Sequence, residues 1–246
     1  MNVRALAIFA LAATLLVAGC ASAPKKRMSY EQKQRLMETN IRLAEEYMIR
    51  NKLDFAMERV EQALALDPDS SRANNMMALL QWQLKQYDKA EDYFERAVDL
   101  DPRNSEAQNN YGVFLCERGR VRGAEERFKK ALKNPLYKTP GDAYLNAGLC
   151  LMKEKAYDEA AGYLRQALKY NPHSSAGLLA MAKVSYINGE YLRARAFIQR
   201  HMAVSKDTPE SLKLAIKIEQ ALGGRNAEAS YRLRLNSKFP QKKNKK

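Results

Sequence analysis

The chain has 246 residues, of which 46% are hydrophobic and 28% are charged, a balance that supports a folded core and excludes disorder throughout. Its 11 glycines and 8 prolines are few for a β-sandwich or a Rossmann-type sheet, which favours long helices. The formal net charge of +14 would suit a nucleic-acid-binding protein, unless the cellular compartment excludes that partner.

The first twenty residues have the pattern of a secretory leader. Arg4 precedes an apolar run over residues 5–18, shorter than the roughly 20 residues that a membrane-spanning helix needs. The next motif, Val17-Ala18-Gly19-Cys20, resembles a bacterial lipobox, in which the cysteine is acylated, for example with palmitate. We therefore expect residues 1–19 to be a signal peptide, Cys20 to be the lipid anchor and residues 20–33 to form a tether.

The residue after the cysteine indicates which membrane holds the anchor. In the lipobox family an aspartate there commonly marks inner-membrane retention, and here the residue is Ala21. The resemblance implies the periplasmic face of the outer membrane, where no nucleic acid is available as a partner. The positive charge then suits anionic lipid headgroups, peptidoglycan or an acidic protein surface.

A pattern of small and bulky residues recurs along the rest of the chain. An alanine is followed four positions later by a bulky apolar residue in five copies and in a weaker sixth, with 34 to 36 residues between copies. The pairs are Ala56/Val60, Ala90/Phe94, Ala124/Phe128, Ala160/Leu164, Ala194/Ile198 and Ala229/Leu233. Such spacing puts both residues on one helical face, and a second helix with apolar spacing near 3.6 precedes each copy.

The ends of these helices are marked by proline. Asp67-Pro68, Asp101-Pro102 and Asn171-Pro172 end the second helix of a copy, because proline disfavours the helical conformation of the residue before it. Each unit is therefore predicted to be a helical hairpin.

This pattern resembles the tetratricopeptide repeat over about residues 34–240. The resemblance implies an all-α fold of about six repeats stacked into a right-handed superhelical solenoid, with a concave groove. The expected repeats are about 37–70, 71–104, 105–140, 141–174, 175–208 and 209–240, with two extra residues in the third copy around 133–140 and a degenerate, capping sixth copy. A basic, disordered tail is expected over 241–246.

In tetratricopeptide proteins the first helices line the concave face, and the resemblance implies a peptide-binding groove there. The main candidates are Asn75, Leu79, Trp82, Asn109, Val113, Asn146, Leu149, Met152 and Tyr186. The asparagines could hold a peptide backbone, since an amide both donates and accepts hydrogen bonds. Packing between helices is the alternative role for each residue. This set lacks a ladder of lysines and arginines, so a hydrophobic peptide or strand is the expected ligand.

The sequence offers no convincing catalytic group, cofactor site or metal site. His173 and His201 are the only histidines, and they are expected to be solvated or capping residues. The carboxylate pairs belong to the polar faces of amphipathic helices. We therefore expect a protein that is not an enzyme and that needs no cofactor.

Cys116 and Cys150 remain after the lipidated cysteine. They fall in the first helices of the third and fourth copies, which pack side by side in this repeat, so a disulfide is expected in an oxidising compartment. Two buried free thiols are the alternative.

A narrower resemblance lies in the third and fourth copies. Residues 109–116 (NNYGVFLC), 134–140 (NPLYKTP) and 145–150 (LNAGLC), together with the lipobox, are similar to the PilF/PilW family of type IV pilus biogenesis and stability lipoproteins. The resemblance implies an outer-membrane pilotin that binds the secretin subunit and promotes its localisation and assembly; we expect a monomer. Two other functions stay open: regulation of a peptidoglycan synthase or hydrolase, and participation in outer-membrane barrel assembly.

Overall fold

The computed structural model describes residues 28–240. The predicted signal peptide, the anchor at Cys20 and the basic tail lie outside the described residues. Contacts divide the chain into residues 1–36 and residues 37–246, and the packing considered below lies within the second unit. None of the described helices is both long and apolar enough to cross a bilayer.

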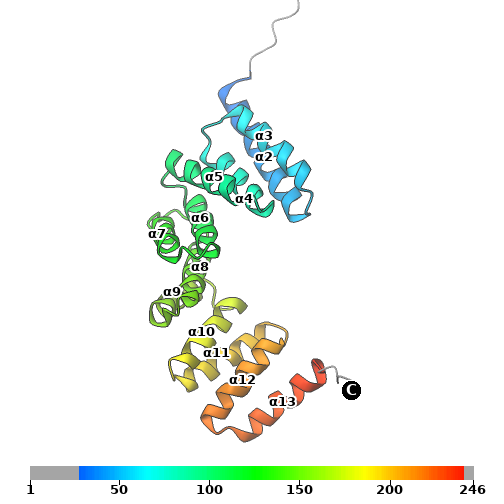
Figure 1. Ribbon diagram of the computed structural model, residues 1–246, viewed down its shortest axis with the longest axis vertical. Helices are drawn as coiled ribbons and strands as arrows, with labels where there is room; N and C mark the ends of the chain where they lie inside the picture. Colours follow the sequence, from blue (N-terminus) through cyan, green and yellow to red (C-terminus); the bar gives the residue numbers. More distant parts are fainter. Residues whose placement is uncertain (1–27, 241–246) are drawn as a thin grey trace, which may run out of the picture. The chain divides into compact units, whose positions relative to one another are not determined.

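Twelve helices form six consecutive hairpins in the described part of the chain (Figure 1), which confirms the predicted all-α architecture. The hairpins are α2 (Tyr30–Ile49) with α3 (Leu53–Leu66), α4 (Ser71–Gln83) with α5 (Tyr87–Leu100), α6 (Ser105–Glu117) with α7 (Val121–Leu132), α8 (Pro140–Lys153) with α9 (Tyr157–Tyr170), α10 (Ser175–Ile187) with α11 (Tyr191–Val204), and α12 (Pro209–Leu222) with α13 (Arg225–Lys238).

The first helix begins earlier than the sequence pattern indicated. Residues 30–33 were expected in the tether, yet α2 already starts at Tyr30. The reason is local, since Ser29 and Gln32 form a capping box. The Ser29 hydroxyl accepts from the Gln32 N–H at 3.2 Å, and the Ser29 N–H donates to the Gln32 side chain at 2.9 Å.

The turns between helices repeat with the same chemistry. Four more of the first helices start, like α2, at a side chain that accepts from the backbone N–H three residues later, at 3.1 to 3.2 Å. These caps are Ser70, Asn104, Ser174 and Thr208. Just after each first helix, one residue has a positive φ, between 55° and 78°. These residues are Asn51, Lys85, Gly119, Lys155, Gly189 and Gly223.

In the first five hairpins, a small buried residue of the first helix is matched by a bulky buried residue of the second. Gly112 and Gly148 lie in first helices, and a methyl group on either would come within 2.7 Å of the side chain of Phe128 or Leu164 in the second helix. Phe128 and Leu164 are fully buried, as are the alanines of the repeated pattern beside them. The two helices of a hairpin therefore approach as closely as these positions allow.

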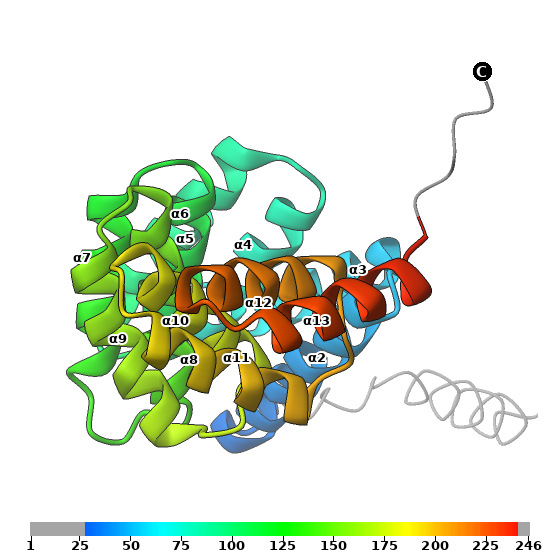
Figure 2. The same cartoon turned by 90° about the horizontal axis from the view of Figure 1, so that it is seen from below.

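The stacking of hairpins gives the solenoid an inner and an outer side. Consecutive first helices contact each other, as α4 does α6, α6 does α8, α8 does α10, and α10 does α12. Among the described helices, the backbones of neighbouring second helices do not approach as closely, although side chains such as Tyr163 and Glu125 bridge α9 and α7. The first helices therefore lie on the inner, concave side. Figure 2 shows α12 and α13 side by side in the last hairpin, and α12 also contacts α10 and α11.

The last hairpin corrects the repeat register that the sequence pattern indicated. Leu233 was aligned with the bulky core residues, but it is 71% exposed, and α13 contains no buried residue. This helix is instead held by Asp207, which accepts from Arg234 at 2.5 Å and from Lys238 at 2.7 Å. These hydrogen bonds, with Arg234 the larger cause, lower the pKa of Asp207.

A covalent link joins the third and fourth hairpins. Cys116 in α6 and Cys150 in α8 form a disulfide in the structure, with Cα atoms 5.8 Å apart and 34 residues between them. The link bridges the two hairpins on either side of the insertion at residues 133–139. Oxidation of this pair in the cell stays a prediction.

The glycine contacts predict opposite effects of the same substitution at two sites. Gly148→Ala should lower the free energy of unfolding by about 1–2 kcal/mol, because the new methyl group meets the buried Leu164. Gly162→Ala is the matched control in the middle of α9, where the nearest atom is 3.9 Å away. It should raise the free energy by about 0.5–1 kcal/mol, because alanine favours the helix. Urea denaturation followed by circular dichroism measures both, and equal effects of the two variants would contradict the packing.

The disulfide predicts a stability that depends on redox conditions. Reduction, or replacement of Cys116 and Cys150 by serine, should lower the free energy of unfolding by about 2–4 kcal/mol, because the unfolded chain regains the freedom of the closed loop. Denaturation with and without dithiothreitol measures the loss, and non-reducing electrophoresis of protein purified from the periplasm reports the bond. The double-serine variant should not respond to dithiothreitol. A wild-type chain equally indifferent to it would show that the bond does not form.

Candidate functional site

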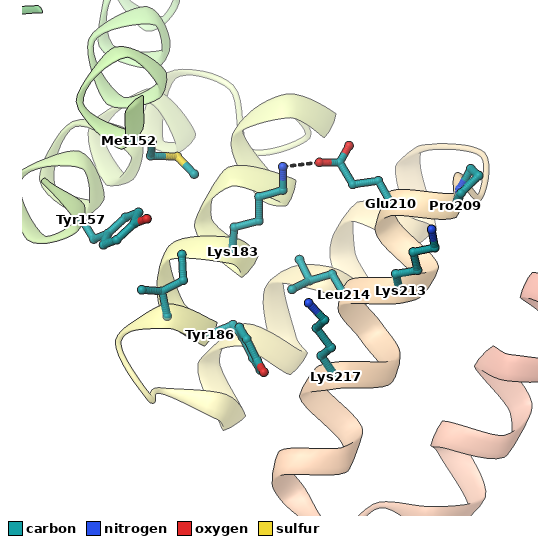
Figure 3. A pocket seen from close by; sticks show the side chains of 10 residues that line it. Met152, Tyr157, Lys183, Tyr186, Pro209, Glu210, Lys213, Leu214 and Lys217 are labelled. Atoms are coloured by element: carbon teal, nitrogen blue, oxygen red, sulfur yellow. Dashed lines mark hydrogen bonds and ion pairs between the residues drawn. The ribbon is translucent and has the colours of Figure 1, made fainter. Parts of the chain in front are cut away.

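The inner side of the solenoid carries a hollow of about 650 Å³ over the last three hairpins. It is open along α8, α10 and α12, which are first helices, and it continues onto the start of α9 (Figure 3). Its lining consists of Met152, Tyr157, Lys183, Tyr186, Ile187, Pro209, Glu210, Lys213, Leu214 and Lys217. We call this hollow the inner groove.

The floor of the inner groove is apolar. Met152, Tyr157, Tyr186 and Leu214 face it from three hairpins, and the Tyr186 ring is braced by Tyr191 at 5.7 Å. Ile187, beside them, is 50% exposed and extends the apolar surface. An exposed apolar surface in a concave site is typical of a region that binds another chain.

The edge of the groove is basic. Lys183 on α10 forms an ion pair with Glu210 on α12, which Figure 3 shows as a dashed line. Lys213 and Lys217 are exposed, and neither is paired with a carboxylate among the described residues. The groove can therefore take apolar side chains on its floor and a carboxylate at the α12 edge.

The predicted site residues separate into three groups. Met152 and Tyr186 line the inner groove. Leu79, Trp82 and Val113 are half-buried and pack against the core between earlier hairpins. Trp82 stands edge-on to the Phe114 ring at 5.6 Å, so its main contacts are internal. Leu149, on α8, is 38% exposed and does not contact the hollow.

The predicted asparagines form bonds between hairpins. Asn75 and Asn109 are buried, with 4% and 8% exposure. The carbonyl oxygen of Asn75 accepts from Asn110 at 3.3 Å, and that of Asn109 accepts from Asn146 at 3.1 Å. These amides hold consecutive first helices together, and their carbonyl oxygens are engaged there.

The basic edge corrects the expectation that the groove lacks lysines. Lys183 and Lys217 continue the repeat series of the candidates Leu79, Val113 and Leu149, and Lys213 belongs to the series of Asn75 and Asn109. The same spacing that identified the apolar candidates would have identified these lysines, had every residue type in the series been followed to the last repeat.

One histidine also departs from expectation. His201 was expected to be solvated or capping, but it is 3% exposed, and its Nδ1 lies 3.0 Å from the Ser175 carbonyl oxygen. It joins α11 to α10, while His173 stays exposed in the turn before α10. Among residues 28–240, no cluster of three or more His, Cys, Asp or Glu side chains could hold a metal ion.

An electrostatic cluster outside the last hairpin lies between second helices. The Tyr163 hydroxyl donates to Glu125 at 3.2 Å, and Lys129 pairs with the same carboxylate at 2.9 Å. Burial, and then the charge of Glu125, raises the pKa of Tyr163 to about 12. These groups are partnered across a helix contact and line none of the hollows described here, so their role is to join α7 and α9.

Known families and structures share this architecture. Tetratricopeptide repeat patterns match residues 41–105, 75–135 and 115–168, and another matches residues 151–216. The type IV pilus assembly protein PilF of Pseudomonas aeruginosa is 28% identical over 242 residues, which cover 98% of this chain and 95% of that protein.

Two solved structures extend the comparison. The structure of Pseudomonas aeruginosa PilF has a TM-score of 0.79 and 27% identity, over 85% of this chain and 94% of that one. The crystal structure of PilW, described as a widely conserved type IV pilus biogenesis factor, has a TM-score of 0.76 and 31% identity, over 85% of this chain and 96% of that one. The chain is thus a superhelical tetratricopeptide repeat protein, and it belongs to the family of type IV pilus biogenesis factors that includes PilF and PilW.

Proposed function

We propose that this protein is a non-enzymatic pilotin of the outer membrane. The lipid chains on Cys20 hold the solenoid at the periplasmic face, and the inner groove binds a segment of an unassembled secretin subunit. Binding covers an aggregation-prone edge of that subunit and raises its concentration at the membrane, where it assembles. The supporting observation is the inner groove itself, an apolar floor with a basic edge in a pilus biogenesis factor.

The groove defines the segment that it would hold. Met152, Tyr186 and Leu214 accept two or three apolar side chains, since together they cross the first helices of three hairpins. Lys213 and Lys217 favour a carboxylate beside those side chains. The proposed ligand is therefore a secretin segment that combines apolar residues with an acidic one, and the originally expected purely hydrophobic peptide is a poorer fit.

Reversal of the basic edge tests the groove. Lys213→Glu with Lys217→Glu should weaken secretin binding by about tenfold or more, because two attractive charges become repulsive. Both side chains are exposed, so the fold should persist. The matched control is Lys89→Glu with Lys169→Glu, which makes the same charge change at exposed positions on second helices. Biolayer interferometry against the purified secretin subunit measures the affinity, and equal losses in both variants would exclude the groove.

Loss of the acylated cysteine tests the anchor. Cys20→Ser should release the chain from the outer-membrane fraction and reduce the yield of secretin multimers in cells, because the fatty chains supply the membrane affinity. Fractionation, with palmitate labelling as the check on acylation, measures the first effect, and electrophoresis of the multimer measures the second.

The same cells would reveal a wrong assignment. Unchanged localisation and assembly in the Cys20→Ser strain would rule out the anchor. A pull-down from solubilised envelope in which a peptidoglycan synthase or a barrel-assembly protein, and no secretin, was enriched would overturn the pilotin role while leaving the fold intact.

A further inference from the structure

The insertion in the third hairpin creates a second hollow away from the inner groove. The Asn134 side chain donates to the Arg103 carbonyl oxygen at 3.2 Å and accepts from the Leu136 N–H at 3.0 Å, so the loop after α7 is fixed against the turn before α6. The resulting hollow of about 620 Å³ lies between the second helices α5 and α7, this turn and the loop. We call it the insertion pocket.

The base of the insertion pocket is closed and its mouth is partly apolar. Val98 and Gln108 are 2% and 1% exposed and form its floor, together with Pro102. Leu136, on the inserted loop, is 84% exposed at the mouth, the most exposed large aliphatic side chain among the described residues. A side chain of a partner could therefore enter between Leu136 and the floor.

The walls of the pocket are strongly basic. Arg103, Arg127, Lys130 and Lys133 line it with a single carboxylate, Asp99. No ion pair involves any of these four cations in the part of the chain that the structure describes. Arg127 lies over the Tyr111 ring at 4.7 Å and donates to the Gln108 side-chain oxygen at 3.5 Å, but no carboxylate pairs with it among the described residues.

Comparison with the preceding repeat shows what is missing. In that repeat Arg96 on α5 forms an ion pair with Asp69 in the turn before α4, at 3.0 Å. The equivalent positions, 34 residues later, are Lys130 on α7 and Arg103 in the turn before α6. Arg103 thus occupies the position of Asp69, so a cation replaces the carboxylate. The two positions that form an ion pair in the preceding repeat carry two like charges here.

We propose that the insertion pocket is a docking site for an acidic segment of a partner protein. A carboxylate of that segment completes the charge pattern between Arg103 and Lys130, and a neighbouring apolar side chain packs between Leu136 and the pocket floor. The apolar floor and mouth favour a peptide over a phosphate group, which would use only the cations. Because the pocket lies on second helices and the inner groove on first helices, both sites can be occupied at once.

One substitution tests the pocket by changing its charge and not its fold. Arg103→Asp recreates the arrangement of Asp69 beside Arg96, so the variant should fold at least as stably as the parent while its own carboxylate takes the place of the partner's. The probe is a fluorescein-labelled peptide, Gly-Glu-Leu-Glu-Leu-Glu-Gly, and fluorescence anisotropy measures its binding to the full chain. All variants carry Lys213→Glu and Lys217→Glu, so that the inner groove does not compete.

The expected result is an affinity at least about tenfold lower for Arg103→Asp than for its parent. The control is Arg165→Asp, an identical charge change at an exposed position on α9, which should leave binding unchanged. Equal losses in the two variants would mean that net charge alone attracts the peptide, and the proposal would be wrong.

The peptide itself supplies the remaining controls. Replacement of its glutamates by glutamine, or of its leucines by serine, should each weaken binding, because the pocket is proposed to need both groups. Unchanged binding of either altered peptide, or no binding of the original one, would overturn the proposal. Thermal unfolding distinguishes a phosphate ligand. If inorganic phosphate, but not the peptide, raised the midpoint of unfolding of the parent, the pocket would be assigned to phosphate groups instead. None of these results depends on secretin binding at the inner groove.

Discussion

The close approach of the two helices in each hairpin is the constraint on which the rest of the solenoid depends. A small residue in the first helix, such as Gly112 or Gly148, leaves room for the bulky side chain that the second helix inserts. Repetition of this contact fixes the geometry of each hairpin, and the contacts between consecutive first helices then set the curvature. The two extra residues of the third hairpin fall in the turn after α7, so Gly148 and Leu164 meet in the next hairpin as their equivalents do before.

This constraint also explains how much of the fold could be predicted from the sequence. The alanine and its bulky partner four residues later are both buried where another hairpin covers the helix. The pattern therefore identified those hairpins from the residue types alone. It failed at Ala229 and Leu233, because within the described residues no further hairpin covers α13, and its hydrogen bonds to Asp207 are polar. Tyr231 of α13 packs against the core cluster of the last hairpins, two positions before the Leu233 that the pattern selected.

The functional surfaces were harder to predict, because repeat spacing identifies a helix face and not the neighbour that covers it. Asn75 and Asn109 share the series of Lys213, yet the asparagines are buried against the next hairpin, whereas the lysine at the end of the series is exposed. Met152 and Tyr186 line the inner groove because their hairpins are those across which the hollow opens.

In a repeat protein, comparison of equivalent positions separates cations that form ion pairs within the fold from cations that have no carboxylate partner. Arg96 is neutralised by Asp69, whereas Lys130 meets Arg103 in the same backbone setting. Lys183 is neutralised by Glu210 from the following hairpin, whereas Lys217, 34 residues later, has no following first helix in the described chain to supply a carboxylate. Since hairpins with and without the ion pair have the same architecture, the unpaired cations are not required for folding. The net charge of +14 does not by itself identify a binding site. Comparison of equivalent positions does, because it shows where the solenoid lacks a carboxylate that a partner can supply.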